Sequence, residues 1–416
     1  MSAGSAQGSG AAAVSGDGGT WALIVGGGTA GHVLPGIAVA RELTRRGHEA
    51  SSIHFVGAER GIESRLVPEA GFGITLLPGR GIQRKLTAAN FGAIWGLTRA
   101  VFKAIALVRR RRPAVVLALG GFASLACSLA AVLWRVPLVV AEQNARAGAS
   151  NRIFGRFAKA CAVPFSDTDL PKLVVTGNPV REEILEAARD RDPAQARRAL
   201  GLPQDRTVIV AFAGSLGSRR LNEAVIGAVE RWSERTDLAV HHVIGTRDWE
   251  ARKTPTTSGI HYQAVPYEER MATVLAAADL AICRSGGTTV AELTVMGLPS
   301  VLVPLPIATR DHQRANAGEL VKADGAVLVS DDEFDADRLV AEVAKILDQD
   351  ESHLADMAAA SARLGRRDAA GAVADLVERH ARRSPGPAGG RTAGGGNAGG
   401  GTGGGSAGGG TPESEQ

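Results

Sequence analysis

Cysteine is scarce in this chain, and its few copies form no disulfide framework. There are three, Cys127, Cys161 and Cys283, which are odd in number, far apart and set in apolar or strand-like stretches. Such a distribution predicts free, buried thiols in a reducing compartment. The first 20 residues also lack the basic and apolar regions of a secretory signal, so we expect a cytoplasmic location.

A large excess of charge of either sign is also absent. The formal net charge is +4, too small to indicate a nucleic-acid partner. Basic residues are nevertheless concentrated at Arg109 to Arg112, the end of a helix-like stretch that starts near Phe91. A basic amphipathic helix is typical of binding to an anionic membrane surface, and Trp95 and Phe102 would then contact the bilayer. A core helix with terminal arginines in solvent explains the pattern equally well.

One uncharged run, Pro113 to Trp134, is long enough to span a bilayer. The pair Gly120 and Gly121 divides it into a strand-like part and a helix that starts near Ala123, and another apolar strand follows at βαβ spacing. We therefore predict a strand and a helix of a sheet domain here rather than a membrane span.

The chain is rich in a repeated order of apolar strand, glycine turn and helix, which is typical of parallel, doubly wound sheets. The predicted strands are residues 21–25, 51–56, 115–119, 136–141 and 173–177 in the first half, and 207–214, 238–245, 279–283 and 300–304 in the second. We predict one helix from Pro35, placed in its first turn, to Arg46, and another from Thr288 to Met296.

This pattern predicts an α/β protein with two Rossmann-like, doubly wound domains facing each other across a cleft. The expected order is a disordered tail at residues 1–20, a first domain at 21–178, a linker at 179–206, a second domain at 207–350, helices at 351–383 that could pack back on the first domain, and a disordered tail at 384–416. The final tail is polar and glycine-rich and cannot bury a core.

Glycine loops after the strands are the candidate ligand sites. Gly26, Gly28 and Gly31 form a GxGxxG pattern between a strand and a helix, which is typical of pyrophosphate binding, and Glu59 could bind a ribose. That pattern alone favours a dinucleotide-dependent oxidoreductase. The second half has glycine loops of its own, at residues 213–220 and 283–293, and an oxidoreductase does not need them.

Seven stretches occur in the order and approximate spacing of a known family: GGGTAGHVLPG, LGGFAS, AEQNARAG, TGNPVR, GSLGSRRLN, CRSGGTTVAEL and DHQRANA. From about Trp21 to His380 the chain resembles the MurG family, the peripheral-membrane glycosyltransferases that add N-acetylglucosamine from UDP-N-acetylglucosamine to the undecaprenyl-diphosphate-linked muramyl-pentapeptide. The resemblance implies the GT-B fold, no cofactor, a role in peptidoglycan synthesis, cell shape and cell division, and a place on the cytoplasmic side of the cell membrane.

The resemblance also implies that the donor binds the second domain. Glu292 would hold the ribose hydroxyls, the backbone of Glu268 would contact uracil, and Gln313 and Asn316 would read the N-acetylglucosamine hydroxyls. The groups implied near the diphosphate are Arg181, Ser215, Gly287, Thr288, Thr289, Val290 and Ala291. If Glu292 stood alone, an ordinary solvated helix glutamate would be an equally good interpretation.

In the first domain the resemblance implies a sugar and acceptor end formed by Thr29, Ala30, Gly31, His32 and Asn144. The implied chemistry is inverting: the acceptor 4-hydroxyl attacks the anomeric carbon, a base takes its proton and UDP leaves. We interpret His32 as the base because imidazole has a suitable pKa, with Glu142 as the reserve candidate and a purely structural role for His32 left open. The first glycine loop would then face the lipid diphosphate of the acceptor.

Four positions depart from the usual family pattern: Ala141, Ala213, Leu216 and His312. Leu216 stands where a glutamine is usual, so a side-chain amide that could reach a substrate is lost. Two alternatives therefore stay open besides the oxidoreductase, namely a UDP-sugar transferase acting on diacylglycerol or another hydrophobic acceptor, and an inactive binding protein.

A metal is not expected. Asp167 to Asp169 read DTD, which resembles a metal-binding motif, but the same spacing recurs at Asp190 and Asp335. The recurrence shows how readily this pattern arises by chance.

Overall fold

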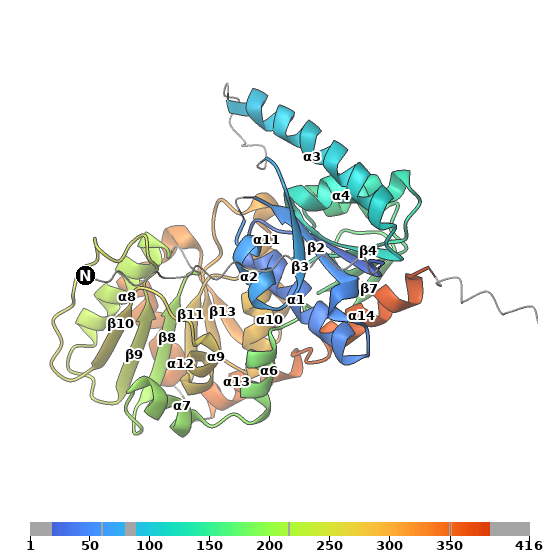
Figure 1. Cartoon of the computed structure of the whole chain (residues 1–416). Coiled ribbons are helices and arrows are strands. Elements are labelled where there is room, and N and C mark those ends of the chain that lie inside the picture. The colour runs from blue at the N-terminus through green and yellow to red at the C-terminus, as the bar shows by residue number, and fades with distance from the viewer. Residues whose placement is uncertain are drawn as a thin grey trace, which may run out of the picture. The chain divides into compact units, whose positions relative to one another are not determined.

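The fold is built from two parallel β-sheets, one in each half of the chain (Figure 1). The computed structural model describes residues 19–59, 61–79, 89–214, 217–348, 350 and 352–382, without the side chains of residues 89–95. Parallel neighbours require crossover connections, which the helices supply. The predicted α/β class with two doubly wound sheets is confirmed.

The first sheet has the strand order β3-β2-β1-β4-β5-β6-β7. Its strands are β1 (Ala22–Gly26), β2 (Ile53–Ala58), β3 (Gly73–Leu77), β4 (Val115–Gly120), β5 (Leu138–Ala141), β6 (Ala160–Val163) and β7 (Leu173–Val175). The chain first moves outward from β1 through β2 to β3 and then returns to build from β4 toward β7. The order therefore reverses between β1 and β4, where open α/β sheets bind their ligands.

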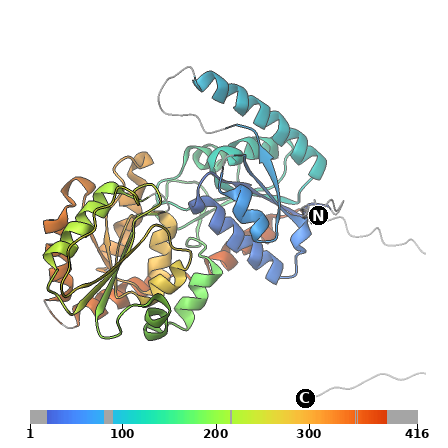
Figure 2. The same ribbon diagram turned by 60° about the vertical axis from the view of Figure 1, so that its left-hand side comes forward.

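Alternation along β1 sends side chains to both faces of this sheet. Leu23 and Val25 pack with helices α3 (Ala89–Arg111), α4 (Gly121–Leu133) and α5 (Ala149–Phe154). Ala22 and Ile24 pack with α1 (Ala30–Arg45), α2 (Glu63–Glu69) and α14 (Ala369–His380). Figures 1 and 2 show α3 lying beside α4, with its N-terminal end extending past the sheet.

Helix α14 comes from the end of the described chain but packs in the first half. Val373 and Val377 are buried in the core of the first sheet. Arg46, which follows α1, donates hydrogen bonds to the carboxylates of Asp375 and Glu378. The chain therefore passes from the first sheet to the second and back again.

The second sheet has the order β10-β9-β8-β11-β12-β13. Its strands are β8 (Thr207–Phe212), β9 (Leu238–Val243), β10 (His261–Val265), β11 (Leu280–Cys283), β12 (Ser300–Leu302) and β13 (Ala326–Leu328). The core on one face includes α8 (Arg219–Arg231), α12 (Ala336–Leu347) and α13 (His353–Arg363). The core on the other face includes α6 (Glu182–Arg189), α7 (Pro193–Leu200), α9 (Met271–Ala277), α10 (Gly287–Met296) and α11 (His312–Lys322). Single 3₁₀ turns lie at η1 (Ala50–Ser52), η2 (Thr309–Asp311) and η3 (Asp331–Glu333).

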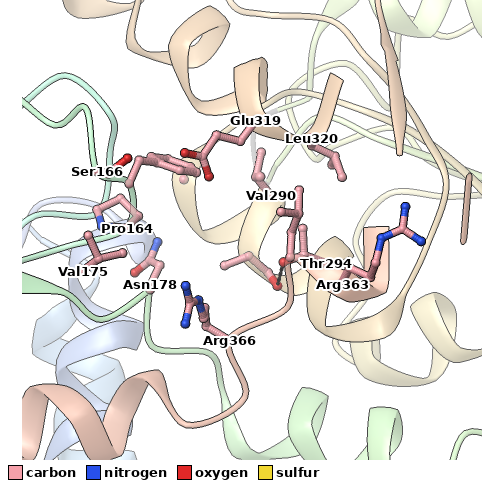
Figure 3. A pocket seen from close by; sticks show the side chains of 15 residues that line it. Pro164, Ser166, Val175, Asn178, Val290, Thr294, Glu319, Leu320, Arg363 and Arg366 are labelled. Carbon is pink, nitrogen blue, oxygen red and sulfur yellow. Dashed lines mark hydrogen bonds between the residues drawn. The ribbon is translucent and has the colours of Figure 1, made fainter. Parts of the chain in front are cut away.

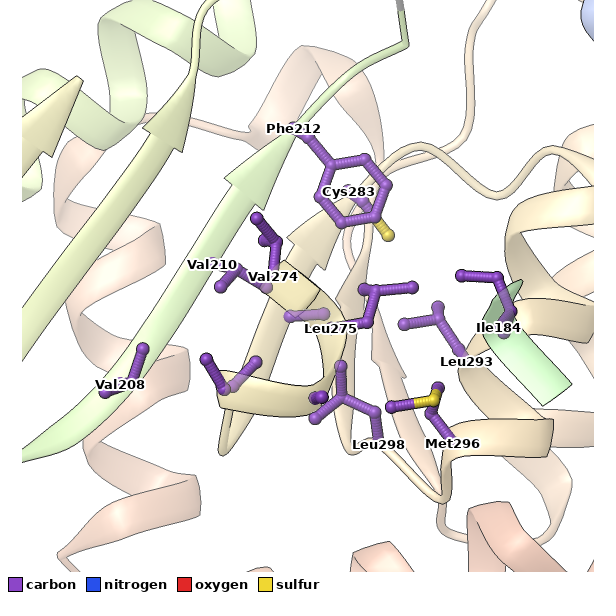
Figure 4. Close-up of a cluster of buried hydrophobic side chains, with 14 of the residues drawn as sticks. Ile184, Val208, Val210, Phe212, Val274, Leu275, Cys283, Leu293, Met296 and Leu298 are labelled. Atoms are coloured by element: carbon purple, nitrogen blue, oxygen red, sulfur yellow. The ribbon is translucent and has the colours of Figure 1, made fainter. Parts of the chain in front are cut away.

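The segment at residues 179–206, interpreted above as a linker, contributes to the core of the second half. Figure 4 shows Ile184 of α6 close to Leu293 and Met296 of α10. The guanidinium of Arg197, on α7, donates to the carboxylate of Asp279 at the start of β11. Apolar packing and a partly buried ion pair thus attach α6 and α7 to the second sheet.

The uncharged run from Pro113 to Trp134 folds as predicted, into strand β4 and helix α4. The helix begins at Gly121, two residues before the predicted start. Gly120 and Gly121 have φ angles of 104° and 84°, which only glycine adopts without strain. No helix among the described residues has the length and hydropathy needed to cross a bilayer.

Two details of the sequence prediction are wrong. Helix α1 begins at Ala30 rather than Pro35, because Thr29 is extended and its carbonyl accepts from the N–H of His32 and Val33. Pro35 is therefore inside the helix, where it lacks the N–H that would bond to the carbonyl of Gly31. As a consequence, His32 lies in the first helical turn and not in the loop.

The second error is that four strands, β3, β6, β10 and β13, were not predicted. They have three to five residues each. Three of them, β3, β10 and β13, are edge strands. The fourth, β6, has the sequence ACAV and contains a single β-branched residue. Short strands without a sustained β-branched or alternating pattern give little local signal.

The three cysteines are free and buried, as predicted. Burial raises the pKa of the Cys161 thiol to about 11 and that of Cys127 to about 12. Thiols with such pKa values are not reactive at neutral pH, so their role is packing.

Replacing Ile184 by alanine tests whether α6 is part of the core. Ile184 is fully buried, so the free energy of unfolding should fall by about 2–4 kcal/mol, from lost burial and the cavity left behind. Denaturant unfolding measures the loss. The exposed neighbour Glu186 is the control, and Glu186→Ala should change stability by less than about 0.5 kcal/mol. Equally small effects of both substitutions would contradict this assignment.

Candidate active site

The predicted site residues follow the carboxyl ends of strands in both sheets. The loops after β1 and β5 carry most of those of the first half, Arg181 follows β7, and the segments after β10, β11 and β12 carry those of the second half. Ser215, together with Leu216, lies outside the described residues. The carboxyl edge is where side chains from separate strands converge in this type of sheet.

The loop after β1 turns at Gly28 and then starts helix α1. Gly28 has a φ of 93°, and the space around its Cα is open, so backbone conformation rather than crowding requires glycine there. Its N–H donates to Oε2 of Glu63 at 2.9 Å. One amide of the predicted phosphate loop is therefore occupied by a carboxylate of the protein itself.

His32 is held by its own turn and by the loop after β4. Its Nδ1 lies 3.0 Å from Oγ1 of Thr29, so the Thr29 side chain binds the imidazole instead of capping the helix. A Cβ on Gly120 would stand 3.1 Å from Nε2 of His32, a contact that only glycine avoids without a shift. The ring is thus oriented from one side by Thr29 and from the other by Gly120.

The electrostatic surroundings of His32 favour a neutral ring. Desolvation lowers its pKa below the ordinary value, and this effect exceeds the opposing influence of the carboxylates of Glu142 and Glu63. His312, at the start of α11, lowers the pKa further. A neutral imidazole at physiological pH can accept a proton.

Glu142 organises the loop after β5. Its Oε1 accepts hydrogen bonds from the N–H of Gln143, the N–H of Asn144 and the Asn144 side chain, while Oε2 accepts from the N–H of Gly148 and from Asn151. The side chain is almost fully buried. Because its lone pairs are used in this way, the geometry favours a positioning role over proton transfer.

Asn316 connects the two halves at this loop. Its Oδ1 accepts from the N–H of Ala145 at 2.8 Å, and its Nδ2 donates to Oδ1 of Asn144 and to the carbonyl of Ser285. The residue is fully buried. All of these hydrogen bonds go to protein groups, so in this arrangement Asn316 orients Asn144 and the α10 loop; the predicted contact with a sugar hydroxyl remains a prediction.

The N-terminus of α10 packs directly against the same loop. A Cβ on Gly287, the first helical residue, would stand 1.9 Å from the carbonyl oxygen of Gln143, so this approach requires glycine. A Cβ on Gly31 would stand 4.0 Å from Oγ1 of Thr288. The N-termini of α1 and α10 therefore approach each other, and both present partial positive charge. The other residues of the α10 start in the predicted site are Thr289, Val290 and Ala291, all in its first turn or just after it.

Arg181 and Glu292 form an ion pair. The Nε and Nη2 atoms of Arg181 each lie 2.9 Å from Oε1 of Glu292. Burial raises the pKa of Glu292, although the charge and hydrogen bond of Arg181 act in the opposite direction. Glu292 is therefore not the solvated helix residue that the sequence left open, and Arg181 orients its carboxylate.

Glu268 and Gln313 also have defined partners. Oε1 of Glu268 accepts from the N–H of Arg270, and its Oε2 lies 3.8 Å from Nε2 of the buried His241. Oε1 of Gln313 accepts from the N–H of Leu305 at 2.9 Å, which fixes its side chain beside the segment after β12.

A cavity of about 320 Å³ lies on the side of α10 that carries Val290, Ala291 and Thr294 (Figure 3). Figure 3 shows Arg366 and Asn178 on one wall, with Glu319 on another. Glu292, Glu268 and Gln313 do not line it. Gly287, Val290 and Ala291, which the resemblance places near the donor diphosphate, do line it, so the cavity shares one side of α10 with the predicted donor contacts.

Two further residues hold site loops and were missed by sequence reasoning. Glu63 bonds the first glycine loop, and Arg284 binds Ser218, the carbonyls of Val303 and Pro304, and Asp331. Arg284 thus joins loops that follow four different strands. The only local signal for Glu63 was the pair of glycines near it, Gly57 and Gly61, whereas Arg284 lies within the glycine loop at residues 283–293 and only its role was missed.

The DTD stretch is used for protein contacts. Asp169 accepts from the N–H of Ala147 and pairs with Arg310 of the second half at 2.6 Å. Among the residues that the structure describes, no group of His, Cys, Asp and Glu side chains is arranged to hold a metal ion.

Two family models match the chain: the glycosyltransferase family 28 N-terminal domain at residues 22–163 and the C-terminal domain at residues 208–373. Together with the two doubly wound sheets, they define a glycosyltransferase of the GT-B fold. Curated relatives and a solved structure narrow this class, and the chain belongs to the MurG family.

The relatives are similar over nearly their whole length. An enzyme of Desulforudis audaxviator (strain MP104C), named UDP-N-acetylglucosamine–N-acetylmuramyl-(pentapeptide) pyrophosphoryl-undecaprenol N-acetylglucosamine transferase, is 38% identical over 86% of this chain and 97% of its own. An enzyme of the same name from Mycobacterium sp. (strain JLS) is 40% identical over 89% and 97%. The crystal structure of Acinetobacter baumannii MurG is 26% identical, with a TM-score of 0.68, over 86% of this chain and 99% of that one.

Proposed function

We propose that this protein transfers N-acetylglucosamine from UDP-N-acetylglucosamine to the 4-hydroxyl of the undecaprenyl-diphosphate-linked N-acetylmuramyl-pentapeptide. The names of the relatives support this reaction. The structural observation that carries it is the approach of the N-termini of α1 and α10, which provides two positive helix ends for substrates that both contain a diphosphate. The product serves peptidoglycan synthesis and, through it, cell shape and division.

In this proposal the second half binds the donor. Glu292 accepts hydrogen bonds from the ribose hydroxyls, and the backbone at Glu268 contacts uracil. The start of α10 binds the donor diphosphate, because its free N–H groups and dipole favour negative charge. Arg181 holds Glu292 in place at 2.9 Å and supplies positive charge near the leaving group.

The transfer inverts the anomeric carbon. The acceptor oxygen attacks that carbon, the bond to the UDP oxygen breaks, and the leaving diphosphate takes the electron pair and is stabilised by the α10 terminus. His32 takes the proton from the attacking hydroxyl through Nε2, in the tautomer whose Nδ1–H donates to Oγ1 of Thr29. Glu142 holds the loop that carries Asn144 in the position in which Asn144 binds Asn316.

A surface in the first half suits contact with an anionic membrane. Phe102 and Leu133 are exposed by 68% and 58%, and Trp134 is also exposed. The guanidinium of Arg109 lies 5.4 Å from the centre of the Trp134 ring. Apolar and cationic groups side by side are typical of proteins that bind at the lipid interface, so we propose peripheral attachment to the cytoplasmic side of the cell membrane.

The three arginines that end α3 and Arg112, which follows it, are not equivalent. Arg111 donates to Oγ1 of Thr20 and is partly buried, and desolvation lowers its pKa. Arg109, Arg110 and Arg112 line the groove beside Phe102 and Trp134. The membrane contact therefore depends on these three. The side chain of Trp95, predicted at the bilayer, lies outside the described residues.

Release of UDP should depend on the acceptor. With labelled UDP-N-acetylglucosamine and the muramyl lipid, we expect labelled lipid product and equimolar UDP, and neither without the lipid. Product formation on a diacylglycerol glycolipid in place of the muramyl lipid would instead identify another hydrophobic acceptor. Donor binding without UDP release in the presence of either lipid would identify an inactive binding protein.

Replacing His32 by alanine should lower kcat about 10²- to 10⁴-fold, the usual contribution of a general base. Because the pKa of His32 lies below its ordinary value of 6.5, the wild-type kcat/KM should fall as the pH drops through a midpoint below 6.5. His32→Ala should lose this acid limb and keep its donor affinity. His353→Ala, at the start of α13, is the control. Nearly unchanged turnover of His32→Ala would remove His32 as the base.

Reversing the charges of Arg109 and Arg110 to glutamate should lower the affinity for phosphatidylglycerol vesicles at least about tenfold, since each basic residue near such a surface contributes about 1 kcal/mol. Vesicle flotation measures this affinity. Arg189→Glu/Arg198→Glu, which has the same change in net charge on exposed positions of α6 and α7, should bind as wild type. Flotation insensitive to the reversal at Arg109 and Arg110 would argue against this membrane surface.

A further inference from the structure

Glu63 is a buried acid that the proposed reaction does not use. It is the first residue of α2, and its side chain is only 1% exposed. Its two oxygens accept from different backbone amides, Oε2 from the N–H of Gly28 at 2.9 Å and Oε1 from the N–H of Ala58 at 2.7 Å. One carboxylate therefore joins the loop after β1 to the end of β2.

Three glycines form the space that this carboxylate occupies. A Cβ on Gly27, Gly57 or Gly61 would stand 2.0, 2.3 or 2.0 Å from the nearest atom of the Glu63 side chain. Each distance is shorter than any real Cβ contact, so no larger residue fits at these positions while Glu63 stays in place. The loop, the end of β2 and the turn before α2 are thus shaped around this one side chain.

The two amides specify a carboxylate rather than an amide side chain. Both oxygens of Glu63 face N–H donors, so a glutamine would set its NH₂ group against one of them. The negative charge also acts on the site, since it opposes the loss of a proton from the imidazolium of His32.

From this geometry we propose that Glu63 is a positioning residue of the glycosyl transfer. Its carboxylate fixes the turn at Gly28 that starts α1, and its charge stabilises the proton that His32 receives from the acceptor. This inference rests on the proposed function. It assigns Glu63 to the acceptor half of the reaction, since its contacts lie in the first half of the chain.

The groups that influence the charge of His32 come from three elements. Glu142 follows β5, Glu63 starts α2 and His312 starts α11. Glu142 and Glu63 raise the pKa of His32, whereas His312 lowers it. Removal of the Glu63 charge alone should therefore lower the pKa of His32.

The test compares Glu63→Gln, Glu63→Asp and the control Glu69→Gln, an exposed acid at the other end of α2. For Glu63→Gln we expect kcat/KM for the muramyl lipid to fall about tenfold or more, as for the loss of a hydrogen bond to a charged group, with the donor dissociation constant within about twofold of wild type. The NMR titration of His32 should move to lower pH. Glu63→Asp should keep the midpoint while lowering the rate, and Glu69→Gln should change neither.

A titration midpoint that stays in place or moves to higher pH would overturn the proposal, because it would mean that the charge of Glu63 does not stabilise the imidazolium of His32. Unchanged acceptor kinetics in Glu63→Gln would also overturn it. If Glu63→Gln does not fold, Gly57→Ala displaces the same carboxylate from β2, and the same two readouts decide. If the wild-type protein does not transfer N-acetylglucosamine to the muramyl lipid, the proposed function fails, while the His32 titration still tests the effect of Glu63.

Discussion

The arrangement of the site depends on the buried carboxylate of Glu142. Five hydrogen bonds converge on it from the loop that follows β5 and from Asn151. A buried charge is tolerated only when its acceptor sites are satisfied, so the loop has one favourable conformation. That conformation places Asn144 and the N–H of Ala145 where Asn316 of the second half can bind both.

Two glycines allow other groups to come close to the backbone around this site. Gly287 allows the start of α10 to reach the carbonyl of Gln143, and Gly120 leaves room for the imidazole of His32. In both places a side chain would separate groups that need to be adjacent. The glycine motifs of this chain therefore serve protein packing as well as the approach of a phosphate, and the first loop already gives one of its amides to Glu63.

Much of the architecture was predictable because its signals are local. Apolar strands, glycine turns and amphipathic helices repeat along the chain, and they predicted two doubly wound sheets. Predictions became inaccurate where a local rule competes with the tertiary structure. Pro35 suggested a helix start, but the extended Thr29 and the packing of α1 begin the helix at Ala30. The edge strand β10 was missed for a different reason: it reads HYQAV and gives little local signal, so only its pairing with β9 identifies it as a strand.

The sequence by itself determined the family and the residue types at the ends of the strands, because short motifs identify both. It also determined the two-sheet class, because local periodicity predicts the alternating strands and helices. It could not determine which side chains bind one another. The pairing of Arg181 with Glu292, the bond of Asn316 to the N–H of Ala145 and the bond of Glu63 to the N–H of Gly28 each join residues that are at least 35 positions apart in the chain. Such contacts exist only once the sheets bring their carboxyl ends together, and so only the tertiary structure decided them.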